Sequence, residues 1–545
     1  MNKKISVIIL SLLYTLFCVV GISFMASNSF KYLTKNFFLV IIITLVLFII
    51  FYFLLTKLFN YLDKYKTNEL KVSNKLLILF DKHPILFSFI IMILAWLIYL
   101  IAFYPAILSP DPSFQLLQYF GIDNKYSSYV VLLDKNVIIT NHHPVIHTLL
   151  LGTCANIGLT LFNDINIGLF IYSIIQTIIL ALTLSYTIFF MKKINTPLKY
   201  QIICLLIYAL VPVFPLYAMS PVKDVIFGCL VILYIIQFYK YLTNMESINI
   251  KSIIRTLILI ILVILFRNNG IHLVILTFPL LILLCKKHYK VYSIMTLIII
   301  TIFITYSKIV LPFFKITPSS IRETLSIPFQ QTARYVSNYD DEVTKNEKEK
   351  IDKILTYDTL KERYNSEKAD PVKNEYNRYA TNEDLKEYFK VWFNMFTKHP
   401  MCYVEATINN TYGYFYPVKT NWYVYYKYNK TLKDNNIDYH YNSLSSLRNS
   451  LSTYGRSFPY IPILGLIVNI GFNNWLLIFM FIYLIYKKKY HEMFYLIPSF
   501  VLTLVCIASP VNAYFRYALP NVFAMPTLLA IFIHIIKKKE LEKSI

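Results

Sequence analysis

Long apolar runs recur along the whole chain, and they constrain its fold more than any other feature. A helix needs about 20 mostly apolar residues to cross the hydrocarbon core of a bilayer. Of the 545 residues 57% are hydrophobic, too many for the polar residues to cover in a water-soluble fold. Hydropathy therefore predicts an all-α, polytopic transmembrane protein with about twelve spans, near residues 5–26, 37–58, 84–108, 167–190, 198–217, 222–242, 252–267, 270–286, 290–313, 472–487, 491–509 and 516–537. A further apolar helix, 456–470, is expected to lie on the membrane or to insert only partly.

The distribution of lysine predicts the topology. The net charge is +23, and basic residues cluster at span ends, as in 191–199, 286–290 and 486–492. Such loops prefer the cytoplasmic side and face anionic lipid headgroups, so the charge does not call for a nucleic-acid partner. These loops share one side, with both termini cytoplasmic, only if the apolar helix 143–162 does not cross. We therefore expect a multi-pass protein of the cell membrane in which this helix stays in the first outer loop.

Composition divides the chain into four parts. The hydrophilic stretch 314–456 has apolar residues three and four apart from Leu385 to Tyr412, which predicts a helical extracytoplasmic domain. Only one cysteine, Cys402, falls within it, so it has no internal disulfide. The first apolar run resembles a signal peptide but is long enough to remain as an uncleaved anchor. The expected parts are a transmembrane hairpin with a basic cytoplasmic loop (1–83), a transmembrane core (84–313) with a catalytic outer loop (109–166), the extracytoplasmic domain (314–456) and C-terminal transmembrane helices with a basic tail (457–545).

Two motifs in the first outer loop contain residues of the types that serve in catalysis or bind metal ions. The segment SPDPSFQ places Asp111 between two prolines directly after a span. Asp111 is either a helix stop or a carboxylate held at the membrane surface as a general base or metal ligand. The motif TNHHPVIHTLL adds His142, His143 and His147. His143 and His147 are four apart, so on a helix they would share a face and bind a metal such as zinc; histidines beside proline also serve simply to cap a helix.

Three further outer turns contain acidic or basic residues. Asp224 either suits the electropositive start of a helix or takes part in chemistry. Arginine on the outer side departs from the positive-inside bias, which indicates an anionic partner. Phosphate is a natural candidate, because the guanidinium group matches it bidentately. Polar groups that converge at the ends of uncharged spans suit a lipid phosphate. The residues in these turns are Lys223, Asp224, Arg267, Asn269, Arg516 and Tyr517.

These motifs together resemble the GT-C superfamily of membrane glycosyltransferases, which includes protein O-mannosyltransferases and bacterial aminoarabinose transferases. In that superfamily an aspartate follows a span, and a short non-crossing helix then opens with an HPP-like motif. SPDPSFQ and HHPVIHTLL match this order, with His143 and Pro144 on the motif and Val145 in place of its second proline. Asp224 matches a second acidic residue in the next outer loop.

The arginine of FRYALP matches one that precedes the last span in the superfamily. The resemblance covers roughly residues 84–310 and the C-terminal spans. The first two spans look like an added hairpin, and HHPVIHTLL also fits an uncharacterised bacterial branch.

The resemblance implies transfer of a sugar from a polyprenyl-phosphate donor to a cell-envelope acceptor at the outer face. Asp111 and Asp224 would be catalytic, with Asp111 taking a proton from the acceptor hydroxyl. A divalent cation, Mg²⁺ or Mn²⁺, held by these two carboxylates would be an optional cofactor. The choice of base stays open among Asp111, Asp123, Asp134 and Asp224. The residues expected to bind substrate are His142, His143, Lys223, Arg267, Asn269, Arg516 and Tyr517.

Other functions also fit the sequence. A polysaccharide polymerase or ligase would share a lipid-linked donor, but its arginines would be essential and Asp111 dispensable. A secondary transporter would place polar residues at the bilayer midplane, where this chain has almost none. A non-catalytic flippase partner or sensor is a third alternative.

Overall fold

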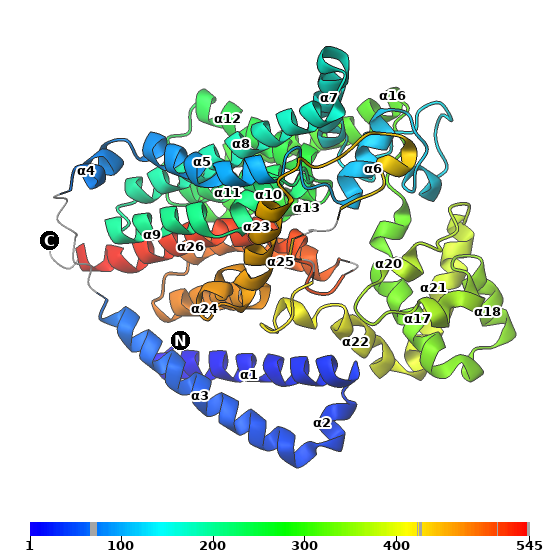
Figure 1. The fold of residues 1–545 in the computed structure, drawn as a ribbon. Helices are drawn as coiled ribbons and strands as arrows, with labels where there is room; N and C mark the ends of the chain where they lie inside the picture. Colours follow the sequence, from blue (N-terminus) through cyan, green and yellow to red (C-terminus); the bar gives the residue numbers. More distant parts are fainter. Residues whose placement is uncertain (66–73, 422, 425–427, 510, 542–545) are drawn as a thin grey trace.

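The computed structural model describes residues 1–65, 74–421, 423–424, 428–509 and 511–541. Within these ranges the chain is almost entirely helical and contains no strand (Figure 1). Extended segments meet only in isolated bridges, such as Thr140 with Thr317. The predicted all-α polytopic membrane fold is confirmed. Residues 66–73 of the basic loop and 542–545 of the basic tail lie outside the described residues.

Eight helical stretches among the described residues are long and apolar enough to cross a membrane, and shorter apolar helices accompany them. All twelve predicted spans have a helical counterpart. The long stretches are α1 (Lys3–Ser27), α3 (Phe37–Asp63), α5 (Pro84–Ala102), α7 (Val145–Phe162), α8 (Ile165–Lys193), α11 (Lys223–Leu242), Lys286–Phe313, which includes α15 (Tyr289–Thr305) and α16 (Leu311–Phe313), and α26 (Phe515–Leu541). The shorter helices are α9 (Leu198–Leu210), α12 (Ile250–Phe266), α13 (Gly270–Thr277), α14 (Leu280–Leu284), α24 (Ile470–Tyr486) and α25 (Ile497–Ile507).

Proline shortens or divides two of the predicted spans. The span predicted over 84–108 ends at Ala102, three residues before Pro105. The span predicted over 198–217 divides at Pro212 into α9 and the short α10 (Val213–Ala218). Proline lacks an amide hydrogen and disfavours helical conformation in the residue before it. Residues 103–109 therefore form an irregular connection that leads into α6 (Pro110–Tyr119).

The prediction of a helix over residues 456–470 is wrong. A helix, α23 (Ser445–Ser457), ends where it was expected to begin, and only 3₁₀ turns follow up to α24. Pro459 and Pro462 lie in this connection, and each removes a backbone hydrogen bond that a continuous helix would need.

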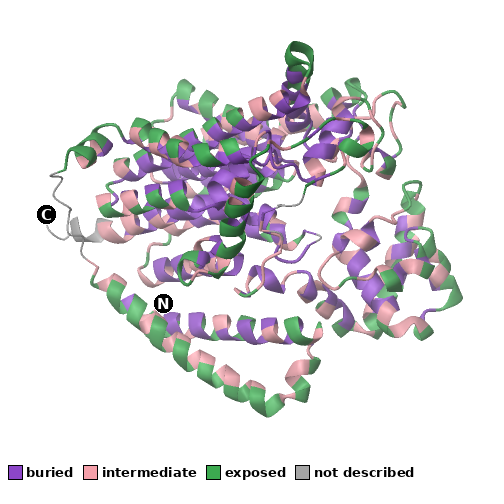
Figure 2. Ribbon diagram, in the orientation of Figure 1, coloured by how far each residue is buried: buried purple, intermediate pink, exposed green. Residues whose placement is uncertain are grey.

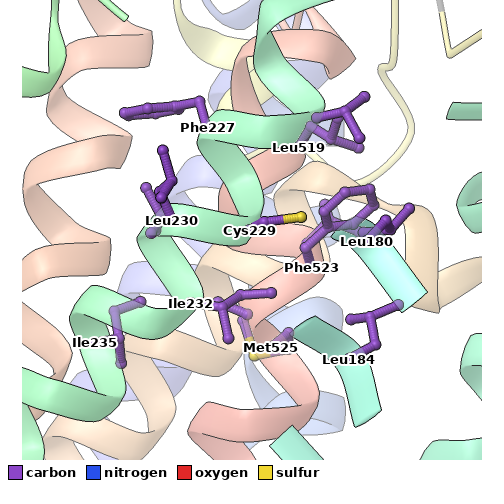
Figure 3. Close-up of a cluster of buried hydrophobic side chains, with 14 of the residues drawn as sticks. Leu180, Leu184, Phe227, Cys229, Leu230, Ile232, Ile235, Leu519, Phe523 and Met525 are labelled. Carbon is purple, nitrogen blue, oxygen red and sulfur yellow. The ribbon is translucent and has the colours of Figure 1, made fainter. Parts of the chain in front are cut away.

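The core of the bundle is built around α11. Every residue of α11 except Lys223 and Leu233 is buried, and Figure 2 shows the buried colour concentrated on this central region. Gly228 lets α26 approach closely, since a Cβ there would lie 3.0 Å from the Phe523 ring. Figure 3 shows side chains of α11 meeting those of α8 and α26. The labelled side chains are Leu180 and Leu184 of α8, Phe227, Cys229, Leu230, Ile232 and Ile235 of α11, and Leu519, Phe523 and Met525 of α26.

The N-terminal hairpin packs on one side of this bundle. Helices α1 and α3 are joined by α2 (Lys31–Lys35), and α3 buries only Phe59. A helix that is apolar and exposed all round is suited to lipid contact. Both long helices of the hairpin contact α24: the Tyr14 ring of α1 lies 4.7 Å from the Trp475 ring, and the Phe59 ring of α3 lies 5.0 Å from the Tyr483 ring. The short α4 (Lys75–Lys82) leads from the hairpin into α5.

Helix α7 contacts α8 only along the first part of α8. The turn between them has Asn163 in the left-handed conformation. A Cβ on Gly158 would lie 2.3 Å from the backbone nitrogen of Gly168, so the two backbones touch there. At the opposite end of α7, His147 bonds to Tyr172 (2.8 Å), still near the start of α8. The rest of α8 continues without α7 beside it, a geometry that suits the predicted non-crossing helix.

Residues 325–403 of the segment 314–456 form a hydrophobic core of their own, which includes Phe329 and Tyr388. The later part of the segment instead joins the core of the bundle, through Tyr414, Leu432 and Tyr439. Figure 1 shows the helices of this separate core beyond one end of the bundle, whereas α1 begins and α26 ends at the opposite end. The predicted helix between Leu385 and Tyr412 is broken before Pro400. The helices of the separate core are α17 (Ser326–Tyr339), α18 (Lys345–Asp352), α19 (Leu360–Arg363), α20 (Asp370–Lys373), α21 (Asn382–Lys398) and α22 (Pro400–Asn409). The last helix of the segment, α23, lies on the bundle, where Arg448 donates to the carbonyl of Ala102 at the end of α5.

Candidate functional site

A cavity of about 770 Å³ lies where the helix bundle meets the segment 314–456. The predicted polar residues lie either in the first turns of α6, α11 and α26 or in the short connections that precede α7 and join α12 to α13. Of the nine predicted site residues, eight line the cavity: Asp111, His142, His143, Lys223, Arg267, Asn269, Arg516 and Tyr517. The ninth, Asp224, has a fully buried side chain that contacts two of these arginines.

Asp111 stands in the first turn of α6, after Pro110, whose missing amide hydrogen costs nothing at a helix start. One carboxylate oxygen accepts a hydrogen bond from the Tyr126 hydroxyl (2.8 Å), and the other from Arg516 Nη2 (2.6 Å). Burial alone would raise the pKa of Asp111, but the charges of Arg516 and Lys223 and the Tyr126 hydrogen bond hold it well below its usual range. Asp111 is therefore ionised at neutral pH. Its side chain is 20% exposed, so a bound molecule can reach it.

Two arginines tie the acidic residues together. Arg516 Nε lies 3.3 Å from Asp224 Oδ2, so Arg516 sits between Asp224 and Asp111. Arg267 Nη1 donates to the other oxygen of Asp224 (2.5 Å). Arg267 also lies over the rings of Phe227 and Tyr517, at 5.3 and 5.2 Å from their centroids. Asp224 thus positions both guanidinium groups at the cavity wall.

His143 is held by Lys223. The ammonium group of Lys223 donates to His143 Nδ1 (2.5 Å), which places the ring proton on Nε2. Nε2 lies 4.0 Å from Asp111 Oδ1 and is buried without a hydrogen-bond partner among the described residues. Burial and the charge of Lys223 hold the pKa of His143 well below its usual range. His143 is therefore neutral, with an unused N–H group beside Asp111.

His142 lies next to His143 and is also neutral. Its ring stacks on Tyr126 at 4.2 Å, and its Nδ1 is 3.6 Å from Glu323 Oε1. Burial lowers the pKa of His142 to about 4, and the charges of Lys223 and Lys373 add to this effect against the opposing charge of Glu323. The histidine pair thus contributes hydrogen-bonding groups without charge.

A family model matches residues 2–545, and its description is "Family of unknown function (DUF6020)". The chain belongs to the DUF6020 family. No curated protein and no solved structure matches it. The family match includes both the α1–α3 hairpin and the segment 314–456, so the DUF6020 architecture includes parts that the GT-C resemblance does not cover.

The histidines of this DUF6020 chain do not share a helix face. Helix α7 begins at Val145, so His143 precedes it, and the expectation of a common face with His147 is wrong. His147 instead turns into the core toward Tyr172. Within the described ranges, no group of three or more His, Cys, Asp or Glu side chains is placed to hold a metal ion.

The predicted Mg²⁺ or Mn²⁺ between Asp111 and Asp224 does not fit the observed geometry well. The guanidinium group of Arg516 occupies the space between the two carboxylates and contacts both. A divalent cation there would meet a like charge. The cation stays a prediction, and no chemical step below depends on it.

Sequence reasoning missed several residues of the cavity wall. Tyr126 and Tyr129 come from the polar part of the first outer loop, and Arg322, Glu323 and Lys373 come from the segment 314–456. In a hydrophilic segment such charges are unremarkable, so only the folded structure singles them out.

Two other candidate bases lie elsewhere. Asp123 accepts hydrogen bonds from Ser127 and its neighbour Asn124, and Asp134 pairs with Lys315 (2.7 Å). Neither carboxylate lines the cavity. Among the four loop carboxylates, Asp111 alone faces the cavity directly.

Proposed function

We propose that this DUF6020 protein is a membrane glycosyltransferase that moves a sugar from a polyprenyl-phosphate donor to a cell-envelope acceptor at the outer face. One observation carries the proposal. A single cavity at the ends of apolar helices places the ionised carboxylate of Asp111 beside three basic groups, those of Arg267, Arg516 and Lys223. That combination suits a hydroxyl nucleophile and a phosphate leaving group.

The rest of the cavity wall suits a lipid phosphate. Six basic side chains line it against three acidic ones, and Asp224 lies behind them, so an anion is favoured. Ile271, Phe303 and Val505 add an apolar stretch of wall from α13, α15 and α25, which belong to the apolar bundle. A phosphate headgroup would meet the arginines while its chain lies against apolar surface.

In the proposed reaction the acceptor hydroxyl oxygen attacks the anomeric carbon of the sugar. The bond from that carbon to the donor phosphate oxygen breaks, and Asp111 takes the hydroxyl proton. The polyprenyl phosphate leaves as an anion, whose charge Arg267, Arg516 and Lys223 stabilise. The free N–H of His143 would orient a substrate oxygen beside Asp111.

Donor binding would also prepare the base. In the resting site Arg516 is shared by Asp111 and Asp224, and its charge makes Asp111 a weak base. A phosphate that draws the guanidinium group toward itself takes that charge away from Asp111. The pKa of Asp111 then rises toward its usual value, and the carboxylate becomes a better proton acceptor only when donor is present.

One observation favours a polysaccharide polymerase or ligase as a second candidate. Both predicted catalytic acids are bound to arginines, Asp111 to Arg516 and Asp224 to Arg267. Their role would then be to position guanidinium groups for a lipid-linked pyrophosphate or phosphate. In that case Asp111→Asn should retain most activity, because an amide oxygen still accepts a hydrogen bond from Arg516.

The deciding experiment compares strains that lack the gene and carry wild type, Asp111→Asn or Asp134→Asn. Mass spectrometry measures polyprenyl-phosphate sugars and the monosaccharides of surface polymers. We expect the deletion to accumulate a lipid-linked sugar and to lose a surface sugar. Wild type and Asp134→Asn should restore both, whereas Asp111→Asn should not, because loss of a general base costs about 10²–10⁴-fold in rate.

Asp134→Asn is the control, because Asp134 pairs with Lys315 and does not line the cavity. It tests whether loss of any carboxylate in this loop prevents rescue. Full rescue by Asp111→Asn, together with no rescue by Arg516→Gln, would support the polymerase or ligase instead. An unchanged set of lipid-linked and surface sugars in the deletion strain would exclude both.

A further inference from the structure

The wall contributed by the segment 314–456 contains an arginine that the proposed reaction does not use. Arg322 is 2% exposed, yet it lines the cavity. Its Nε donates to Glu323 Oε1 (3.1 Å), and its guanidinium carbon lies 3.1 Å from the centroid of the Tyr129 ring. Its Nη1 is buried without a hydrogen-bond partner among the described residues. A buried charged donor without a partner is costly, so a bound acceptor atom would satisfy it.

Two more cations lie on the same wall. Lys373, also nearly fully buried, pairs with Glu323 Oε2 (2.8 Å) and with Asp370 (3.1 Å). Lys125 is exposed and lies 5.7 Å from the same Tyr129 ring over which Arg322 stacks. Glu323 is therefore shared by Arg322 and Lys373, and the wall keeps an excess of positive charge.

The histidine pair His142 and His143 lies between this wall and the basic cluster formed by Lys223, Arg267 and Arg516. His142 lies 3.6 Å from Glu323 on one side, and His143 contacts Lys223 on the other. Both histidines are neutral, so they separate two positively charged regions of one cavity without adding charge. A cavity with two such regions fits two anionic groups bound side by side.

We propose that Arg322, together with Lys125 and Lys373, forms a second anion subsite that binds an acidic group, phosphate or carboxylate, of the acceptor. Only the assignment to the acceptor rests on the proposed function. The planar guanidinium fork, held over the Tyr129 ring, presents its free Nη1 to such a group. The transferase would then act on an acidic envelope polymer or an acidic glycolipid rather than on a neutral one.

The test uses the full chain purified in detergent micelles and isothermal titration calorimetry. Saturating polyprenyl phosphate first fills the cluster around Arg267 and Arg516. Glycerol 3-phosphate and glucuronate are then titrated as phosphate and carboxylate probes, with glycerol as the neutral control. We expect wild type to bind an acidic probe and Arg322→Gln to bind it at least about tenfold more weakly. Arg322→Lys, which keeps the charge but not the fork, should be intermediate.

Two further variants keep the test decisive. Lys125→Glu inverts a charge at an exposed residue, so it should fold normally and still weaken binding of the acidic probe. Arg363→Gln removes a partly exposed ion pair with Glu375, two residues that do not line the cavity, and should bind as wild type does. Tighter binding of glycerol 3-phosphate than of glucuronate would assign a phosphate, and the reverse order a carboxylate.

The outcomes separate this inference from the proposed function. Wild-type affinity in both Arg322→Gln and Lys125→Glu, or no difference between the acidic probes and glycerol, would overturn the second subsite and leave the donor site standing. A second outcome is that polyprenyl phosphate does not bind, but an acidic probe added alone binds to wild type and more weakly to Arg322→Gln. That result would support the second subsite and exclude polyprenyl phosphate as the donor carrier.

Discussion

Arg516 is the residue on which the arrangement of the site depends. It separates two carboxylates that would otherwise face each other in a buried environment, and it contacts both. Buried ion pairs are costly to break because the partner left behind keeps its charge without compensation. At this scale the charges of the site act as one connected unit, so substitutions within it should not be additive.

Arg516→Gln should lower the free energy of unfolding by about 3–5 kcal/mol, the usual cost of leaving a buried charge unpaired. Adding Asp111→Asn to this variant should restore part of the loss, because it removes the carboxylate that has lost its arginine, whereas Asp224 keeps its ion pair with Arg267. Thermal unfolding of the purified protein measures both changes. Strictly additive losses in the double variant would show that the two side chains are independent.

Tyr126 should tune the pH dependence of activity through Asp111. The pKa of Asp111 is held below its usual value, so the ionised form persists as pH falls and is lost only below the ordinary aspartate range. Tyr126→Phe removes one hydrogen bond to that ionised form, so the acidic limb of the kcat/KM profile, which reports the enzyme without bound donor, should move to higher pH. Tyr129→Phe, whose hydroxyl bonds to Asn374 instead, should leave the limb in place. If the acidic limb lies at the same pH in Tyr126→Phe and Tyr129→Phe, the role of Asp111 as base is contradicted.

At the scale of elements, the contact between α7 and α8 fixes the first outer loop. Gly158 and Gly168 allow the two helix backbones to touch, and α7 then delivers its first turn and the preceding histidines to the cavity. Gly152 makes a similar approach to the Tyr119 ring of α6. Small residues at these positions therefore set the position of His143 relative to Asp111.

Gly158→Val should lower the free energy of unfolding by about 1–3 kcal/mol, because backbone atoms of Gly168 cannot move aside as a flexible side chain can. All seven cysteines are free and buried, so a thiol-reactive fluorescent dye reports unfolding without an added label. Asn156→Ala, at an exposed position on the same helix, should melt as wild type does. Equal melting of the two variants would show that the helices are not in contact at Gly158.

The elements show which parts of the structure follow from sequence patterns. Hydropathy found a helix for every predicted span, because length and apolarity are local properties. Helix ends marked by Asp111, Lys223 or Arg267 also follow locally, since polar residues must close an apolar helix. The contact between Asp111 and Arg516 does not follow, because it joins residues 405 positions apart. Arg322 was missed for a related reason: its importance arises from burial beside Tyr129, which its hydrophilic neighbours do not reveal.

At the scale of the whole molecule, two bodies meet around the cavity. The helix bundle supplies the basic cluster of Lys223, Arg267 and Arg516, and the segment 314–456, in which residues 325–403 form a separate core, supplies the wall around Arg322. The cavity is therefore complete only when both are folded and docked. This arrangement also requires both bodies to meet at the same side of the membrane.

Cysteine labelling tests that topology, because buried native cysteines give a low background. Lys386→Cys on α21 and Asn163→Cys at the α7–α8 turn should react with a membrane-impermeant thiol reagent in intact cells. Lys488→Cys, after α24, should react only in permeabilised cells. If Asn163→Cys behaves like Lys488→Cys, then α7 crosses the membrane and the predicted topology is wrong.

The place of Arg516 in the chain has a consequence for biosynthesis. The ribosome produces Asp111 long before it reaches α26, so this carboxylate is made well ahead of the guanidinium group that pairs with it, whereas Asp224 meets Arg267 soon after its synthesis. A nascent chain that stops before its last helix therefore leaves Asp111 without its arginine partner and lacks the part of the cavity wall that Arg516 and Tyr517 provide. Insertion of the final helix completes both the ion pair and the cavity in one step, so we expect prematurely terminated copies to be less stable than the full chain.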